Sequence, residues 1–134
     1  MKKTLFLAAL CSALALTSAP AAGQLARHMT ELSGAPQAKT MRGKLRGRDT
    51  AEYTVHLREG QTLAVRLKTN LRSNYFNVTG PDGGEALFVG SRDGARYRAK
   101  VTQEGVYKIS VYLMPNAARR DERASYSLKI EVKD

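Results

Sequence analysis

The clearest pattern in the chain lies at Tyr107-Lys108-Ile109-Ser110-Val111-Tyr112-Leu113. An apolar or aromatic side chain occupies every second position from 107 to 113, and the positions between them carry Lys, Ser and Tyr. Successive side chains of a β-strand point to opposite faces of a sheet, so this period of two predicts a strand with one buried and one solvated face. Such half-buried strands are typical of antiparallel sheets.

The same alternation, or a short apolar run of strand length, recurs along the chain. It is found at residues 41–46, 53–58, 63–68, 75–79, 86–89, 97–101 and 126–133. Turn-forming sequences separate these segments, namely Glu59-Gly60, Gly80-Pro81-Asp82-Gly83, Arg92-Asp93-Gly94 and Glu104-Gly105. About eight short strands without a competing helical pattern predict an all-β fold, an antiparallel β-sandwich.

The N-terminal residues have the features of a secretory signal peptide. Lys2 and Lys3 precede an apolar stretch at residues 5–16, and small residues that suit a signal peptidase follow it. We therefore expect residues 1–22 to be cleaved on export and the mature protein to be periplasmic. The single Cys, Cys11, leaves with this segment; a lipoprotein signal is disfavoured because a bulky leucine precedes that Cys.

The mature chain divides into a lead-in and one domain. Residues 23–37 hold apolar residues at helical spacing, but Gly34 and Pro36 interrupt the pattern, so a short helix or a flexible arm is expected. Residues 38–134 form the single β-sandwich domain. A core of this size folds without disulfide bonds.

The composition favours a binding protein over an enzyme. The chain of 134 residues has a formal net charge of +10, and loss of the leader lysines leaves about +8. His28 and His56 are isolated, and no nucleophile motif or zinc-ligand spacing occurs in the sequence. Asp121 and Glu122 are flanked by arginines, which favours ion pairing over acid–base catalysis. We expect no catalysis, no cofactor and no metal.

Two groups of basic residues are candidates for binding. The first alternates with small and apolar residues along one predicted strand and consists of Arg42, Lys44, Arg46 and Arg48. The second lies between the last two predicted strands, in a loop or single helical turn, and consists of Arg119, Arg120 and Arg123. The guanidinium fork suits bidentate binding of carboxylates or phosphates. The alternative is a solvated surface with local pairing to neighbouring carboxylates.

An acidic cleft on another protein is the expected partner of these cations. Nucleic acid is not expected, because the strand tyrosines fall on apolar faces and leave no exposed aromatic run for base stacking. Membrane insertion is not expected, because no amphipathic cationic helix is visible. The exposed edges of a sandwich allow a homodimer, and the sequence leaves the oligomeric state open.

A series of short motifs carries a resemblance to a known family. The motifs are Gly47-Arg48-Asp49, Tyr53-Thr54-Val55, Glu59-Gly60-Gln61, Gly105-Val106-Tyr107, Asn116-Ala117-Ala118-Arg119 and Tyr126-Ser127-Leu128. In order and spacing, from about Lys39 to the C-terminus, they resemble the periplasmic inhibitors of g-type (goose-type) lysozyme. Some of them also recur in prepeptidase C-terminal-like β-sandwich modules.

The resemblance implies a β-sandwich whose basic loop residues enter the substrate cleft of the lysozyme and block its catalytic acid, which protects peptidoglycan. On matching positions, this role falls to Arg119, Asn116, Arg120, Arg48 and Asp49. Pro115 stands where the family has a first Arg, and Arg48 stands where it has a Tyr. Secondary candidates are Arg92, Asp93, Tyr97 and Arg123, and residues 93–97 are similar to a Ser-Gly-x-x-Tyr loop of other lysozyme inhibitors.

Two other functions remain open from the sequence. Prepeptidase-type sandwiches accompany secreted hydrolases, so the domain could instead be a non-catalytic module that binds envelope glycan or another anionic polymer. The third alternative is a structural envelope protein whose charge confers solubility. The sequence contains no recognisable catalytic grouping, which argues against an enzyme.

Overall fold

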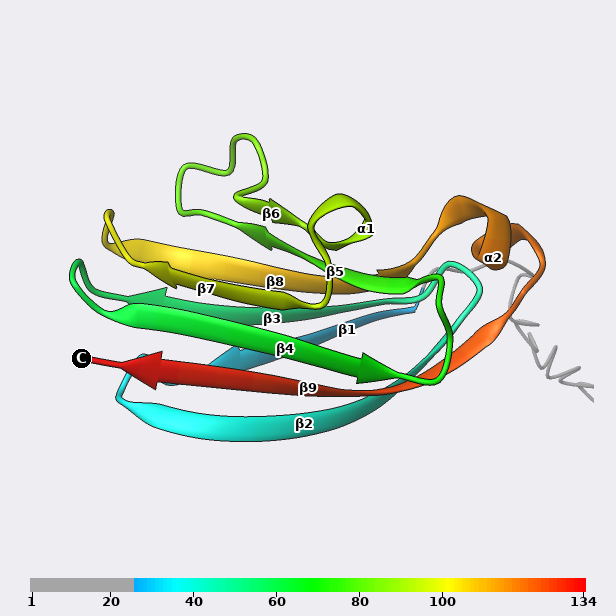
Figure 1. The fold of residues 1–134 in the computed structure, drawn as a ribbon, viewed down its shortest axis with the longest axis horizontal. Helices are drawn as coiled ribbons and strands as arrows, with labels where there is room; N and C mark the ends of the chain where they lie inside the picture. The colour runs from blue at the N-terminus through cyan, green and yellow to red at the C-terminus, as the bar shows by residue number, and fades with distance from the viewer. Residues whose placement is uncertain (1–25) are drawn as a thin grey trace, which may run out of the picture.

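The computed structural model describes residues 26–134 and shows two β-sheets packed face to face (Figure 1). The five-stranded sheet consists, in spatial order, of β1 (Arg27–Leu32), β3 (Thr50–Leu57), β8 (Gly105–Leu113), β5 (Asn74–Thr79) and β6 (Phe88–Val89). The four-stranded sheet consists of β2 (Gln37–Arg46), β9 (Arg123–Lys133), β4 (Thr62–Thr69) and β7 (Arg96–Lys100). Two helical turns, α1 (Gly90–Asp93) and α2 (Pro115–Arg119), complete the described chain. The predicted all-β sandwich is confirmed.

Alternating side chains of the strands fill the space between the sheets. In β8 the buried residues are Tyr107, Ile109, Val111 and Leu113, the positions at which the sequence places its apolar and aromatic side chains. The hydroxyl groups of Tyr53 and Tyr126 meet within this core at 2.7 Å, so neither buried phenol lacks a partner. Gly43 lies opposite Tyr126 in the β2–β9 pair, and a Cβ there would be 2.4 Å from the phenol oxygen. The glycine therefore leaves room for the tyrosine ring.

Each segment predicted to be a strand contains one in the structure, although of residues 86–89 only Phe88 and Val89 form a strand, and the description of the lead-in was wrong where it can be compared. Residues 27–32 form β1, which pairs in parallel with β3, instead of a short helix or flexible arm. The helical spacing of the apolar residues was misleading, because Leu32 is buried whereas Met29 is 67% exposed. Backbone hydrogen bonds to β3 decide the conformation. The expected signal peptide, residues 1–22, lies outside the described residues.

The loops gather at two opposite ends of the sandwich (Figure 1). The α2 end comprises the β2–β3 turn and the segment with α2 that joins β8 to β9. The opposite end, which we call the Gln61 end, comprises the β1–β2 and β3–β4 connections and the C-terminus. No helix of residues 26–134 has the length and apolar character needed to cross a membrane.

Candidate functional site

The site is built on the α2 segment, which is a single helical turn, one of the two forms expected from the sequence. Pro115 occupies the start of this turn, where the missing N–H of proline costs no hydrogen bond. Ala117 is completely buried and fixes the turn to the end of the core. Asp121 ends the segment with a φ of 55°, a left-handed conformation that Asp tolerates better than most residues.

Two contacts tie the α2 segment to the β2–β3 turn. The Gly47 N–H donates to the Glu122 carbonyl at 2.9 Å, and the Arg46 Nε donates to the Asp121 carboxylate at 2.8 Å. Gly47 has a φ of 58°, and a Cβ there would lie 2.8 Å from the carboxylate of Asp121. Hydrogen bonding from the Arg46 guanidinium lowers the pKa of Asp121, and the same contact raises the pKa of Arg46. The turn and the loop therefore act as one unit.

A shallow hollow of about 370 Å³ lies where this turn meets α2. Its walls are Arg48, Asp49, Thr50, Tyr112, Leu113, Pro115, Ala118 and Arg119. The fold thus brings together Arg48, Asp49 and Arg119, which the sequence predicted as binding residues on two distant segments. We call this feature the Arg48–Arg119 hollow.

The two arginines of the hollow are available for a partner. Both are exposed, and neither forms an ion pair with any residue in the described part of the chain. Arg119 donates from Nη2 to the side-chain oxygen of Asn116 at 2.5 Å, so Asn116 orients the guanidinium without neutralising it. Exposed guanidinium groups of this kind can receive carboxylates in a bidentate manner.

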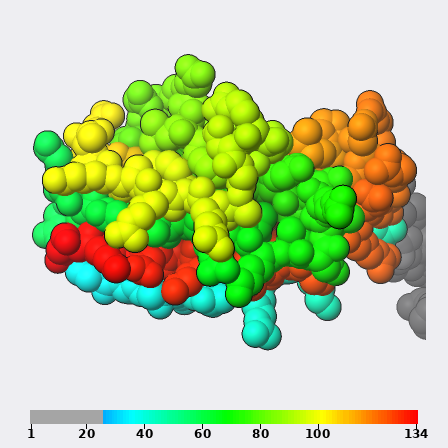
Figure 2. Space-filling model, in the orientation of Figure 1, coloured from blue at the N-terminus to red at the C-terminus, as the bar shows by residue number. Residues whose placement is uncertain are grey.

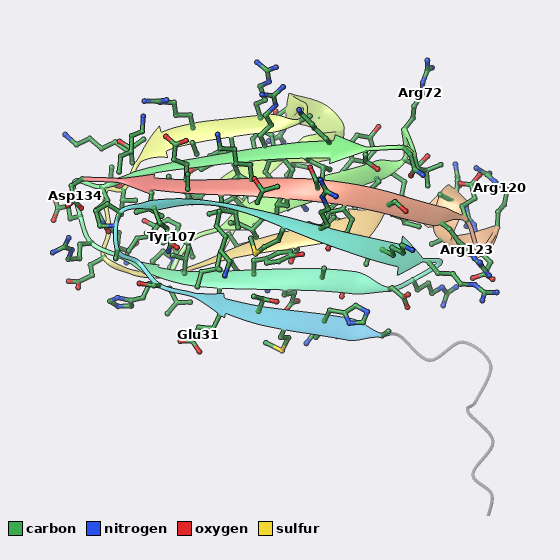
Figure 3. All side chains as sticks on the ribbon, turned by 90° about the horizontal axis from the view of Figure 1, so that it is seen from below. Glu31, Arg72, Tyr107, Arg120, Arg123 and Asp134 are labelled. Atoms are coloured by element: carbon green, nitrogen blue, oxygen red, sulfur yellow. The ribbon has the colours of Figure 1, made fainter. Side chains whose placement is uncertain are left out.

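Two other predicted residues at this end are already engaged. The carboxylate of Asp49 accepts hydrogen bonds from the backbone N–H groups of Arg46 at 3.1 Å and Ala26 at 3.3 Å. Asp49 therefore shapes the turn that presents Arg48. Arg120 lies 3.4 Å from the carboxylate of Glu122 and projects, like Arg123, from this end of the molecule (Figure 3).

The secondary candidates do not join the hollow. Arg92 and Asp93 belong to α1, which lies beside β5 and β6 and apart from α2 (Figure 1). They pair with each other at 3.0 Å, and hydrogen bonding from Arg92 and from the Val89 N–H lowers the pKa of Asp93. Tyr97 is half-buried, with its ring 5.4 Å from that of Phe88. Arg123 begins β9 on the outer face of the four-stranded sheet.

The sequence analysis missed Tyr112 and Thr50 as residues of the hollow. Tyr112 lies on the outer face of β8, and its hydroxyl donates to the Asn77 side-chain oxygen at 2.9 Å. The available signal was a large aromatic at a position where the alternation of β8 otherwise places Lys and Ser. Residues 26–134 contain no group of three or more His, Cys, Asp or Glu side chains that could hold a metal ion.

The two packed sheets define the class of small antiparallel-type β-sandwich domains, and solved structures of known proteins share this fold. PliG of Aeromonas hydrophila, a periplasmic lysozyme inhibitor of g-type lysozyme, is similar with a TM-score of 0.65 and 28% identity, over 81% of this chain and 100% of that chain. PliG of Salmonella Typhimurium has a TM-score of 0.60 and 18% identity, over 79% and 99% of the two chains. The resemblance inferred from the motifs is confirmed.

A prepeptidase C-terminal domain has the same kind of fold. The prepeptidase C-terminal domain of a Bacillus anthracis collagenase has a TM-score of 0.55 and 14% identity, over 83% of this chain and 100% of that chain. At that identity the similarity concerns the fold alone. No protein-family model matches the sequence, and no curated protein matches it.

Proposed function

We propose that this protein is a non-enzymatic, periplasmic inhibitor of g-type lysozyme that occludes the substrate cleft with its α2 end. The observation that carries the proposal is the Arg48–Arg119 hollow, which gathers two guanidinium groups that form no ion pair within residues 26–134, on a fold similar to that of known inhibitors. Arg48 and Arg119, candidate binding residues from separate motifs, both line it, which supports the proposal.

The chemistry of the hollow suits an acidic cleft. Glycoside hydrolases cleave with carboxyl groups placed beside the scissile bond. A guanidinium that pairs with such a carboxylate holds it ionised and removes the proton donor that the leaving group needs. Arg119 and Arg48 supply this group, and Arg120 supplies a further cation at the rim.

The attachment of the α2 segment to the core lowers the conformational entropy that is lost on binding. Ala117 is anchored in the core, and the Gly47 N–H is bonded to the Glu122 carbonyl, so little backbone freedom remains to be lost. Because the interaction is electrostatic, we expect association to slow as the salt concentration rises.

The first test is lysis of a peptidoglycan suspension by goose-type, chicken-type and invertebrate-type lysozymes, each with and without the purified protein. Selective loss of goose-type activity at near-stoichiometric protein is expected. Inhibition of none of the three would contradict the proposal and favour the alternative of a module that binds envelope glycan or another anionic polymer.

The sharper test is Arg119→Ala. Inhibition is expected to weaken about 30-fold or more, because truncation leaves a buried carboxylate of the partner without its counter-charge. The thermal unfolding midpoint should stay at the parent value, since Arg119 is exposed and bonds only to the exposed Asn116. The matched control is Arg58→Ala, which removes an exposed arginine from the Gln61 end. Equal inhibition by the Arg119 variant and the parent would remove this residue from the mechanism.

A further inference from the structure

The outer face of the four-stranded sheet carries an array of cations that the proposed inhibition does not use. Exposed Lys and Arg side chains project from all four strands. They are Arg42, Lys44 and Arg46 on β2, Arg123, Lys129 and Lys133 on β9, Arg66 and Lys68 on β4, and Arg96, Arg98 and Lys100 on β7. We call this surface the basic face. Figure 2 shows the four strands side by side on the side toward the viewer.

The strand register sets like charges directly opposite one another. Arg66 is paired with Lys129 on β9 and with Arg96 on β7, so one row of three cations crosses three strands. At the α2 end, Arg46 is paired with Arg123. Like charges at directly opposed positions destabilise a sheet. An anionic partner that lies across these rows would relieve this repulsion.

Little of this charge is neutralised within the molecule. Among the described residues of the basic face the one carboxylate is Glu131, which lies 3.0 Å from Lys133 and 3.8 Å from Lys129. At the edge, Asp121 is engaged with Arg46. The row of Lys129, Arg66 and Arg96 therefore keeps most of its charge for an external anion.

The part of the face nearest the α2 end is hollowed in a way that suits a phosphate group. A shallow depression of about 580 Å³ is lined by Arg42, Lys44, Lys68 and the small side chains of Ser125 and Ser127. The register places Ser127 between Arg42 and Lys68. A hydroxyl donor flanked by two cations offers both hydrogen bonds and charge to a phosphate oxygen.

We propose that the basic face docks on an anionic lipid surface and binds the phosphates of its headgroups. The cations are spread in two dimensions, with strands about 4.8 Å apart and same-face residues about 7 Å apart along a strand. A linear polymer would follow one line of this array, whereas a planar layer of headgroups meets all of it. Charge complementarity therefore favours the lipid surface.

The described residues of the basic face include no exposed large apolar side chain, and this limits how deeply the face can enter a lipid layer. Among residues 26–134 the exposed large hydrophobics are Met29 on β1, Leu87 just before β6 and Val106 on β8, all in the five-stranded sheet or beside it. The basic face thus meets headgroups without insertion into the acyl layer. The Arg48–Arg119 hollow lies at the end of the sandwich and remains open to a second partner.

The test is co-sedimentation of the purified secreted protein with vesicles at low and physiological salt. The vesicles contain phosphatidylcholine with about one-third phosphatidylglycerol, or phosphatidylcholine alone. Binding to the anionic vesicles that weakens with salt is expected, with none to the zwitterionic ones. Absence of binding to the anionic vesicles at low salt would overturn the proposal, as would binding to soluble polygalacturonate without binding to vesicles.

Two matched triple variants separate the effect of the basic face on vesicle binding from the effect of net charge. The first variant removes the row of three cations by combining Lys129→Thr, Arg66→Thr and Arg96→Thr; we call it the central-row variant. Its affinity for the anionic vesicles is expected to fall about 100-fold. Arg58→Thr with Arg72→Thr and Lys108→Thr removes the same charge elsewhere and should cost about 3-fold or less. Equal losses in the two variants would contradict a specific face.

Two further readouts keep the result interpretable. Thermal unfolding of the central-row variant should be no lower than that of the parent, because opposed like charges have been removed. Lysozyme inhibition by the same variant tests the proposed function separately, because the α2 end is intact in it. Lost vesicle binding with retained inhibition supports both proposals, and retained vesicle binding overturns this one.

Discussion

The two ends of the sandwich carry motifs of the same family resemblance but use them differently. At the α2 end, the motif side chains of Arg48 and Arg119 are exposed and make no ion pair with the described residues. The backbone around them is fixed, while the charges remain free. This end is arranged to present functional groups to a partner.

At the Gln61 end, the motif residue is buried and its amide is fully used. The side chain of Gln61 donates to the Gly34 carbonyl at 3.0 Å and to the Asp134 carboxylate at 2.9 Å. Its oxygen accepts the N–H of Arg58 at 2.8 Å. Gln61 therefore joins the β1–β2 connection, the β3–β4 turn and the C-terminus.

The difference teaches that a shared motif does not by itself mark a binding site. Glu59-Gly60-Gln61 and Asn116-Ala117-Ala118-Arg119 both contribute to the resemblance in sequence, the second more specifically than the first. Burial and internal hydrogen bonds distinguish the motif that holds the fold from the motif that faces a partner. Substitutions at the two ends should therefore separate stability from inhibition.

The largest effect on stability is expected from Gln61→Ala. The substitution leaves the Gly34 carbonyl and the Arg58 N–H without their partner, and the free energy of unfolding should fall by about 3 kcal/mol. Urea denaturation measures this fall, while inhibition per folded molecule should be unchanged. Gln103→Ala, at an exposed loop position, is the control and should stay within about 0.5 kcal/mol of the parent. A urea midpoint for Gln61→Ala equal to that of the parent would contradict the proposed difference between the two ends.

A smaller effect is expected from Tyr126→Phe, in the core between the two ends. Burial, together with the hydrogen bond to Tyr53, raises the pKa of Tyr126. An unfolded tyrosine ionises from about pH 10 while the folded one stays protonated, so the contribution of Tyr126 to stability is constant below that pH and falls above it.

The Phe variant should lose about 1 kcal/mol at pH 7 and show a shallower alkaline decline than the parent. Urea midpoints at pH 8 and at about pH 11 measure both quantities. Identical alkaline declines in the two proteins would mean that Tyr126 does not contribute to the pH dependence.

The smallest effect on stability is expected from Asp121→Asn, at the α2 end. Asn retains the left-handed backbone conformation but loses the ion pair with Arg46. The pKa of Asp121 is lowered in the folded state, so its contribution is present above about pH 4 and is lost as the pH falls through the folded value. Urea midpoints should differ slightly at pH 7, and the difference should shrink as the pH falls below the unfolded value of about 4. A difference that persists in acid would assign the effect to the loop backbone instead of the ion pair.

The strands could be predicted from the sequence because burial on alternate positions is a local property. Segments such as 107–113 and 126–133 display it without help from the rest of the chain. β1 could not be predicted in this way, because it is held by parallel pairing with β3 and buries little besides Leu32. Its apolar spacing fits a helix that the fold does not form.

The sites depend on information that single segments lack. Arg48 and Arg119 were each predicted as binding residues, but their meeting depends on the bond between Gly47 and Glu122, which belong to distant parts of the chain. From the sequence, the basic face likewise could be inferred only in part, from the cations that alternate along β2. Strand register then adds cations such as Arg66 and Lys129 to it.

The position of β9 has a consequence for the timing of folding. This strand is the last in the chain, yet it lies in the interior of its sheet, between β2 and β4. In a polypeptide that emerges with its N-terminus first, β2 and β4 therefore wait for the final eleven-residue strand before their sheet can close. Such long-range pairing slows folding, because a large loop must be ordered before any contact compensates it.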